Sequence, residues 1–195
     1  MTDAASAKND GRLSETQSRP GFLLKPIRRL MSMGEKGLKT PDVIVIQKEK
    51  TVFRMDGNGR WYNEFGRFEK KKIIDYFHSA IQRDEEGYFL QQEKDGYLEK
   101  AYFHYDDTAL FVFHITLGES VSLRLNTGKE LKLNPESLFI KNDHLYLNLE
   151  GEPVKFTDRT MMKIAAILEE KGEECWIRIK GKRYKIPEIH EKKTS

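Results

Sequence analysis

The side chains best suited to chemistry lie in two stretches of the chain, residues 61–90 and 145–179. Both stretches combine aromatic rings with acidic turns, and the first adds a histidine and an arginine. Aromatic rings can line a ligand groove, and a histidine beside acids can transfer protons. The candidate ligand-binding residues are Trp61, Tyr62, His78, Arg83, Tyr88 and Trp176. Core packing is the competing interpretation for the aromatic members of this set.

The chain lacks the short motifs of common catalytic and nucleotide-binding sites. It contains no G-x-S-x-G, no G-x-x-x-x-G-K-[ST] and no G-x-G-x-x-G. Asp84, Glu85 and Glu86 are adjacent acids on a turn, where a solvated connection explains them better than a general-acid pair. We therefore predict no catalytic residue. A site in which Asp84 or Glu93 meets His78 through the tertiary fold stays open as the enzyme alternative.

The histidines and the cysteine do not predict a metal site. A metal ion needs several ligands that converge on one point. His104 and His114 fall on opposite faces of a predicted hairpin, or well apart on one face if the register slips by one residue. Cys175 is the only cysteine, and its place before Trp176 indicates a small buried side chain. We predict neither a metal ion nor a cofactor.

Positive charge is concentrated at the two ends of the chain. Residues 1–39 hold eight Lys or Arg and four acids, and residues 180–195 hold six and two, so each end carries a net charge of +4. Because the whole chain carries +3, the body over residues 40–179 carries −5. A nucleic-acid-binding protein places its positive charge on the folded face. This distribution argues against a nucleic-acid partner for the folded part.

Two helices are expected to position the candidate residues. Apolar residues at 73, 74, 77, 80 and 81, and again at 161, 164, 165 and 168, follow the spacing of one helix face. These patterns predict helices over 69–82 and 158–170, each followed by an acidic, glycine-containing turn and a short strand. Thr157 is the predicted N-cap of the second helix, with its hydroxyl accepting from an early helical N–H. Lys70, Lys71 and Lys72 oppose the dipole of the first helix, which indicates either a contact or a solvated face.

The two helix-containing stretches resemble each other at an offset of eighty-eight residues. This offset pairs Phe68 with Phe156, Phe77 with Ala165, and Tyr88 with Trp176. The pairing predicts an internal duplication with Phe77 buried. The aromatic residues at matching positions are then either core residues or the lining of a groove between the two units.

Most of the remaining chain is predicted to form strands joined by tight turns, at Asp56–Gly59, Asp106–Thr108, Asn126–Lys129 and Asn142–Asp143. The expected fold class is α+β, with two similar subdomains that each pack a helix on a largely antiparallel sheet. The predicted organisation is a disordered or loosely attached basic extension over 1–40, a first unit over 41–125, a second unit over 126–187 and a polar tail over 188–195.

Three runs of residues carry a resemblance to a known family. They are D-G followed by R-W-Y, then I-I-D-Y-F-H-S-A-I-Q-R-D-E-E-G-Y-F-L, and then L-N-T-G-K-E-L. Over residues 43–187 the chain resembles an uncharacterised bacterial family, catalogued as domain of unknown function 1285. The resemblance implies two similar α+β subdomains, no established enzymatic activity and a part in signal transduction. It implies no catalytic residue.

The N-terminal extension offers a second way to bind a partner. Residues 19–39 combine six bases with apolar side chains, which suits weak contact with an anionic membrane surface or with nucleic acid. Pro26 and Gly34 restrict any helix there to a short piece, so self-docking or disorder is favoured. The chain has neither a signal-peptide core nor a run of ~20 apolar residues. A cytoplasmic location is therefore the simplest expectation.

The expected function is a non-catalytic binding or signalling module of unknown ligand, with a protein or a small molecule as its partner. The alternatives are an enzyme whose site is assembled at the junction of the two units, and a nucleic-acid or membrane-surface binder that acts through the basic extension. No nucleic-acid partner and no transmembrane segment are expected for the folded part.

Overall fold

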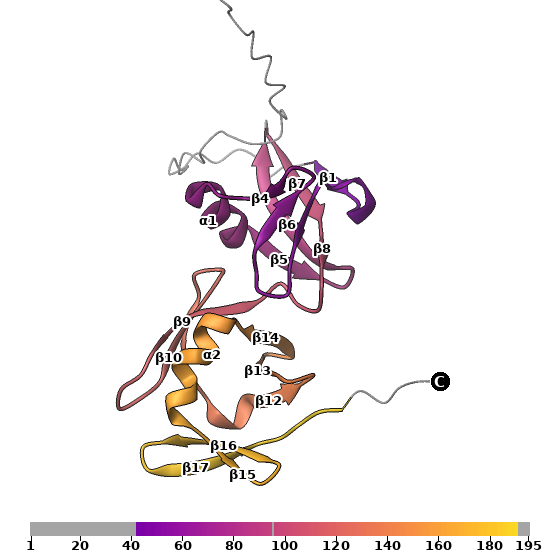
Figure 1. Ribbon diagram of the computed structural model, residues 1–195. Coiled ribbons are helices and arrows are strands. Elements are labelled where there is room, and N and C mark those ends of the chain that lie inside the picture. Colours follow the sequence, from indigo (N-terminus) through magenta and orange to yellow (C-terminus); the bar gives the residue numbers. More distant parts are fainter. Residues whose placement is uncertain (1–41, 95, 191–195) are drawn as a thin grey trace, which may run out of the picture. The chain divides into compact units, whose positions relative to one another are not determined.

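The computed structural model describes residues 42–94 and 96–190, with the elements labelled in Figure 1. These residues belong to one compact unit of the chain. The predicted membrane-surface contact of residues 19–39 lies outside the described residues. Within the described part, no helix combines the length and the apolar composition that crossing a membrane would require.

A small sheet holds the first two candidate residues. Its strands are β2 (Phe53–Met55), β3 (Trp61–Asn63), β4 (Gly66–Arg67) and β8 (His104–Tyr105). The strand order is β4-β3-β2-β8, with β8 parallel to β2. Asp56 stabilises the turn from β2 to β3, because its carboxylate accepts backbone N–H groups of Asn58 and Arg60. Gly59 is required there, since its φ is 73° and a Cβ atom would lie 2.9 Å from the ring of Phe111.

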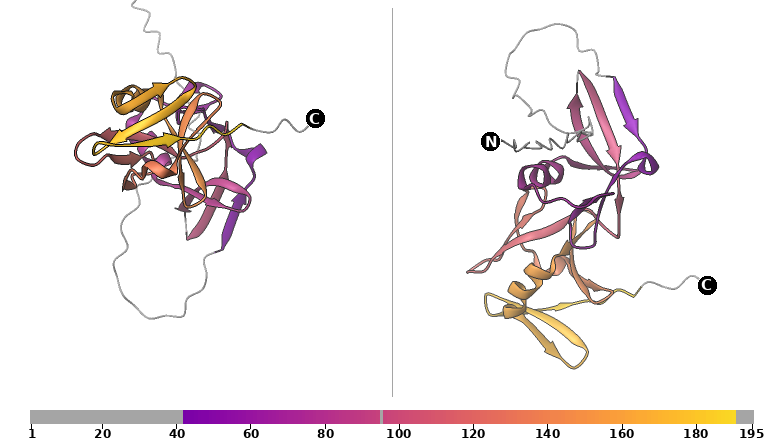
Figure 2. Two further views of the ribbon diagram at one scale, coloured as in Figure 1. Left: turned by 90° about the horizontal axis from the view of Figure 1, so that it is seen from below. Right: turned by 45° about the horizontal axis from the view of Figure 1, so that its top comes forward.

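The first helix leads into a second sheet. The elements are β1 (Val43–Ile46), the 3₁₀ turn η1 (Lys48–Lys50), α1 (Lys71–Ser79), β5 (Ile81–Asp84), β6 (Gly87–Lys94) and β7 (Tyr97–Tyr102). The order is β1-β7-β6-β5, and β1 lies parallel to β7 at one edge (Figure 2). The predicted helix over 69–82 was too long at both ends. Ile81 pairs with Leu90 across β5 and β6, so the last apolar residue of the helical pattern belongs to a strand.

The largest sheet has six strands. They are β9 (Phe111–Thr116), β10 (Ser122–Leu125), β11 (Glu130–Lys132), β12 (Leu138–Lys141), β13 (His144–Leu149) and β14 (Glu152–Phe156), with the 3₁₀ turn η2 (Pro135–Ser137) before β12. The order β11-β10-β9-β14-β13-β12 brings together strands from both sides of the expected boundary between residues 125 and 126. The predicted turn at Asn142–Asp143 joins β12 to β13 in antiparallel register and is confirmed.

One predicted hairpin does not form. The strand that ends at Tyr105 was expected to pair with the strand that follows Asp106–Thr108. Instead β8 pairs with β2, while β9 pairs with β10 on one side and with β14 on the other. His104 and His114 therefore lie on different sheets, because both edges of β9 are occupied by other strands.

The second helix leads into a three-stranded antiparallel sheet. The elements are α2 (Asp158–Ile164), the 3₁₀ turn η3 (Ala165–Ile167), β15 (Leu168–Lys171), β16 (Glu174–Ile179) and β17 (Lys182–Ile186). The helix predicted over 158–170 thus ends earlier, because Leu168 begins a strand that pairs with β16. Thr157 is the N-cap residue, but the predicted cap hydrogen bond was wrong. Its hydroxyl donates to the carbonyl of Val112 on β9.

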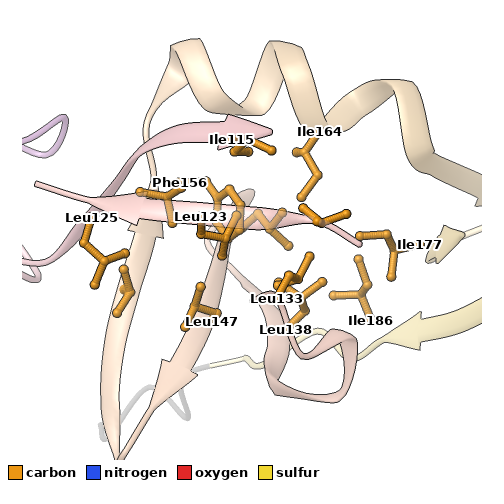
Figure 3. Close-up of a cluster of buried hydrophobic side chains, with 14 residues drawn as sticks. Ile115, Leu123, Leu125, Leu133, Leu138, Leu147, Phe156, Ile164, Ile177 and Ile186 are labelled. Atoms are coloured by element: carbon orange, nitrogen blue, oxygen red, sulfur yellow. The ribbon is translucent and has the colours of Figure 1, made fainter. Parts of the chain in front are cut away.

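Two hydrophobic clusters stabilise the described chain. The aromatic core contains Phe53, Trp61, Phe68, Phe77 and Phe103, whose rings meet mainly edge to face. The aliphatic core gathers side chains of the six-stranded sheet, α2 and the last sheet, and it includes Ile115, Leu123, Leu147, Ile164 and Ile177. Figure 3 shows Ile164 reaching from the α2 ribbon toward Ile115, with Ile177 and Ile186 beside it. The predicted burial of Phe77 is confirmed.

The fold is α+β and rich in sheet. Most strand pairings are antiparallel, but β1–β7, β2–β8 and β9–β14 are parallel, so the sheets are mixed. The order of three strands, a helix and three strands occurs twice, over β2–β7 and β12–β17. The ladder pairs Ile81–Leu90 and Leu168–Ile177 are eighty-seven residues apart, one fewer than the sequence offset. At that spacing the buried Ile164 stands opposite Phe77, whereas Ala165, its predicted counterpart, is exposed.

Candidate functional site

The structure places Trp61 and His78 together inside the aromatic core. Their ring centroids are 5.9 Å apart, and both side chains are buried. The amide of Asn126 lies 3.1 Å from His78 Nδ1 and also donates to the carbonyl of Ala109. Because an amide nitrogen only donates, His78 Nδ1 accepts and its proton sits on Nε2. Burial lowers the pKa of His78 to about 4, so the ring is neutral at neutral pH.

Arg83 and Tyr88 form a second group, which ties β5 and β6 to β14. Arg83 makes an ion pair with Glu152, and the Tyr88 hydroxyl donates to the same carboxylate at 2.9 Å. Thr108 lies 3.5 Å from that hydroxyl and donates to the carbonyl of Pro153. Burial raises the pKa of Tyr88 to about 12, so it stays protonated at neutral pH. This group is a polar connection between strands that are distant in sequence.

Tyr62 and Trp176 lie on two different sheets, β4-β3-β2-β8 and β15-β16-β17. Each ring lies against an arginine. The guanidinium of Arg54 is 4.7 Å from the centroid of Tyr62, and that of Arg183 is 5.4 Å from the centroid of Trp176. The structure thus brings together Trp61 with His78 and Arg83 with Tyr88. Asp84 accepts from Tyr102 and Lys100, so it shares no hydrogen-bond partner with His78.

A groove that the six candidate residues do not line is formed by β9, β10, β11 and α2. Its volume is about 630 Å³. Two rows of neighbouring residues cross the three strands at this place. One row is His114, Arg124 and Glu130, and the other is Thr116, Ser122 and Lys132. Lys163 of α2 completes the lining.

Strand alternation explains why these polar side chains face outward. Ile115 on β9 and Leu123 on β10 are buried in the aliphatic core, so their neighbours His114 and Arg124 point to the opposite face of the sheet. On α2, Thr160 donates to the carbonyl of Val112 on β9. That hydrogen bond and the burial of Ile164 hold α2 beside β9 (Figure 1). Lys163 of α2 lines the groove.

The electrostatics of this groove are positive. Arg124, Lys132 and Lys163 line it, and Glu130 is the one acid among the described residues that do so. Glu130 lies opposite Arg124 in the β10–β11 ladder, yet no ion pair joins them, and none of the three bases has an ion-pair partner within residues 42–94 and 96–190. We call this feature the basic groove.

His114 reports the same positive potential. Burial first, and then the nearby charges of Arg124, Arg159, Lys163 and Lys71, lower its pKa. Lys71 belongs to the lysine run at the start of α1, for which a contact was one of the two interpretations. Bases from β10, α2 and α1 thus act on one imidazole.

Sequence reasoning missed the basic groove for an identifiable reason. His114 was considered only as a metal ligand, and Arg124 and Lys132 look like ordinary outward-facing strand residues. The turn at Asn126–Lys129, which was expected, already places Arg124 opposite Glu130. The approach of Lys163 depends on the packing of α2 against β9, and no local pattern indicates it.

Comparisons with known proteins address the fold. No family model matches the chain, and no curated protein matches it. A DUF1285 family protein from Silicibacter pomeroyi has a similar structure, with a TM-score of 0.52, 12% identity, and coverage of 75% of this chain and 83% of that one. A DUF1285 family protein from Shewanella baltica gives a TM-score of 0.44 and 17% identity, over 59% of this chain and 91% of that one. The resemblance to this family predicted from the sequence is confirmed at the level of the fold.

Proposed function

We propose that the protein is a non-catalytic binding module that holds an anionic ligand in the basic groove. The observation that carries this proposal is the set of three bases, Arg124, Lys132 and Lys163, which line one cavity without an ion-pair partner among the described residues. A bound anion would form charge-assisted hydrogen bonds with these side chains and relieve their mutual repulsion.

The negative net charge of the surrounding body makes the three bases of the groove informative. The body over residues 40–179 carries a net charge of −5, so acidic partners for surface bases are plentiful. Some exposed bases elsewhere use them, as in the pairs Lys71–Asp75 and Lys185–Glu174. A cavity that gathers bases while the rest of the body is acidic favours a ligand that supplies the missing negative charge.

The arrangement supports binding rather than catalysis. A general base needs a neighbouring group that orients it and a nucleophile within hydrogen-bond reach. Within the described residues His114 has no side-chain hydrogen bond, and burial, together with the nearby bases, lowers its pKa. We assign it the role of a ligand contact.

We further propose that the chain arose by internal duplication and acts in signal transduction, as the family resemblance suggests. The repeated order of three strands, a helix and three strands supports duplication, as does the correspondence of Phe77 with Ile164. Superposition of an experimental structure's β2–β7 on β12–β17 tests the duplication, and unrelated helix placement would contradict it.

Sulfate is the simplest probe of the basic groove. We expect sulfate to raise the melting temperature of the wild-type protein in a salt-matched titration, with a smaller effect at higher ionic strength. The double variant Arg124→Gln/Lys163→Gln should lose this response. The control Lys50→Gln/Lys182→Gln removes the same charge from exposed residues of η1 and β17 and should keep it. A wild-type protein without the response, or an equal loss in both double variants, would contradict the proposal.

A further inference from the structure

We infer that the ligand of the basic groove is a small polyol or sugar that carries at least two phosphate groups. This inference rests on the proposed function and adds the chemical class of the ligand. It draws on the size of the cavity, the spacing of its bases, its hydroxyl groups, its single acid and the absence of aromatic rings from its described lining.

The cavity has the size of a small-molecule site. Its volume of about 630 Å³ lies within the range of roughly 300–1,000 Å³ that is typical of ligand pockets. An inorganic phosphate or sulfate ion would fill only a small part of it. Ile115, Leu123 and Leu131 also belong to the lining, but their side chains pack in or against the aliphatic core on the other face of the sheet, so the groove offers a ligand mainly polar contacts.

The bases come from three separate elements, so two phosphate groups can contact them at different points of the groove. Arg124 and Lys132 lie on neighbouring strands and on rows that are two residues apart, a separation of about 7 Å along the strand. Lys163 approaches from α2. A ligand with two phosphates can contact Arg124 with one group and Lys132 with the other, and each contact gains from the ionic charge.

The hydroxyl groups beside Lys132 match phosphate better than carboxylate. Thr116 and Ser122 share a row with Lys132, so two O–H donors lie on the same face of the sheet as one ammonium group. A phosphate carries a charge of about −1.5 to −2 and three acceptor oxygens, which one base and two hydroxyls can satisfy together. A carboxylate has one oxygen fewer and a lower charge.

Glu130 allows the groove to recognise hydroxyl groups of a ligand in addition to its phosphates. A carboxylate among bases would weaken phosphate binding unless it has a partner of its own. Glu130 lies opposite Arg124 in the ladder but makes no ion pair with it among the described residues, so its oxygens are open to a donor. The hydroxyl groups of a polyol are such donors, and the acid then helps to orient the ligand.

Single-stranded nucleic acid fits the basic groove poorly. Proteins that bind single strands stack bases on aromatic side chains, and each stacked base contributes about 1–3 kcal/mol. The described residues that line the groove include no Phe, Tyr or Trp, and His114 supplies the one ring. A ligand without a nucleobase matches this lining.

Isothermal titration calorimetry with defined probes tests the inference. We expect fructose 1,6-bisphosphate to bind at least tenfold more tightly than glucose 6-phosphate, and fructose to show no binding. Lys132→Gln should remove most of the advantage of the bisphosphate, while Lys50→Gln/Lys182→Gln should keep it. Circular dichroism and thermal melting show whether each variant is folded. Lys163→Gln, on the surface of α2, provides a second variant if Lys132→Gln is unstable.

Glu130→Ala separates polyol recognition from charge alone. Removing the acid should tighten the binding of inorganic tripolyphosphate, which has no alcohol groups, and should weaken the binding of fructose 1,6-bisphosphate. If Glu130→Ala tightens both ligands, or if the bisphosphate binds no better than the monophosphate, the inference is wrong. Tighter binding of an oligothymidylate or of poly-L-glutamate would also overturn it, while the anion-binding function would stand. If neither sulfate nor any of these probes binds, both proposals fail.

Discussion

The aromatic core and the aliphatic core solve the same packing problem with different side chains. Both lie beside a helix that follows three strands and precedes three more. In the aromatic core, Phe77 fills the space among Phe53, Trp61 and Phe68, and its ring meets each of theirs edge to face. In the second, the corresponding Ile164 packs among aliphatic chains. The difference shows that the order of elements does not dictate the chemistry of the core.

The two cores also differ in where their histidines lie. The aromatic core encloses His78, which is anchored through Asn126 and held neutral. Beside the aliphatic core the buried polar side chains Thr157 and Thr160 donate to the carbonyl of Val112, and His114 lies on the outer face of β9. One region therefore contains a buried titratable group, and the other presents the basic groove to solvent.

The strongest test of the aromatic core is Phe77→Ala. Removing this fully buried ring should lower the free energy of unfolding by about 3–5 kcal/mol, because it leaves a cavity among rings that cannot close in. Urea denaturation of both proteins measures the change. Phe65→Ala is the control, since Phe65 is 85% exposed and its loss should matter by less than about 0.5 kcal/mol. A loss below about 1 kcal/mol for Phe77→Ala would contradict the assigned core role.

Ile164→Ala makes the matching change in the aliphatic core. It should cost about 2–5 kcal/mol, and less than Phe77→Ala because fewer atoms are removed and aliphatic neighbours adjust more easily. Met162→Ala, two residues earlier and 75% exposed, should be close to neutral. Equal losses for Ile164→Ala and Ala165→Gly would instead support the eighty-eight-residue alignment.

The buried histidine should make the protein less stable in mild acid. The pKa of His78 is about 4 in the folded protein and about 6.5 when unfolded, so the unfolded chain binds the extra proton as the pH falls between these values. The free energy of unfolding should drop by about 2–3 kcal/mol between pH 7 and pH 4.5 from this group alone. Urea denaturation of wild type and His78→Asn at pH 7 and at pH 4.5 isolates the contribution of His78. If His78→Asn loses as much stability as wild type between the two pH values, His78 is not the source of the acid sensitivity.

Protonation of His114 should strengthen ligand binding, whereas protonation of the His78 site lowers stability. Burial and then the charges of Arg124, Arg159, Lys163 and Lys71 lower the pKa of His114, and Glu130 is the acid that shares the groove with it. Lowering the pH through that pKa adds a positive charge beside a bound anion, worth about 1 kcal/mol or a factor of about five in affinity. Sulfate keeps its charge over pH 5–8, so calorimetry at several values measures the effect. His114→Asn should give a flat profile, and an unchanged slope would rule His114 out as the source.

The smallest predicted effect compares the first turns of the two helices. The first turn of α1 has Lys71 and Lys72 and no acid, whereas α2 begins with Asp158. Lys72→Glu should therefore raise the free energy of unfolding by about 0.3–1 kcal/mol, and Lys72→Gln by less. The gain should shrink at high salt. A gain that is insensitive to salt would point to a contact other than the helix dipole.

The local structure of this protein is largely readable from its sequence. Turn residues such as Asp56, Gly59 and Asn142 fix backbone conformations through their own side chains or their freedom to adopt positive φ, so the hairpins they form are readable. The helix positions and the burial of Phe77 follow from apolar periodicity. Helix ends were less readable, because Ile81 and Leu168 fit a helical stripe and a buried strand equally well.

Strand pairing and the gathering of the bases depend on how the whole chain packs. Whether β9 pairs with β8 or with β14 depends on competition among distant strands, and no local pattern encodes that competition. The six candidate residues were chosen by type, yet four of them form two structural groups, in the aromatic core and around Glu152. The basic groove arises because a parallel pairing and the packing of α2 bring Arg124, Lys132 and Lys163 together from separate elements. Electrostatic potential depends on distances in space, and those distances are set by packing rather than by sequence spacing.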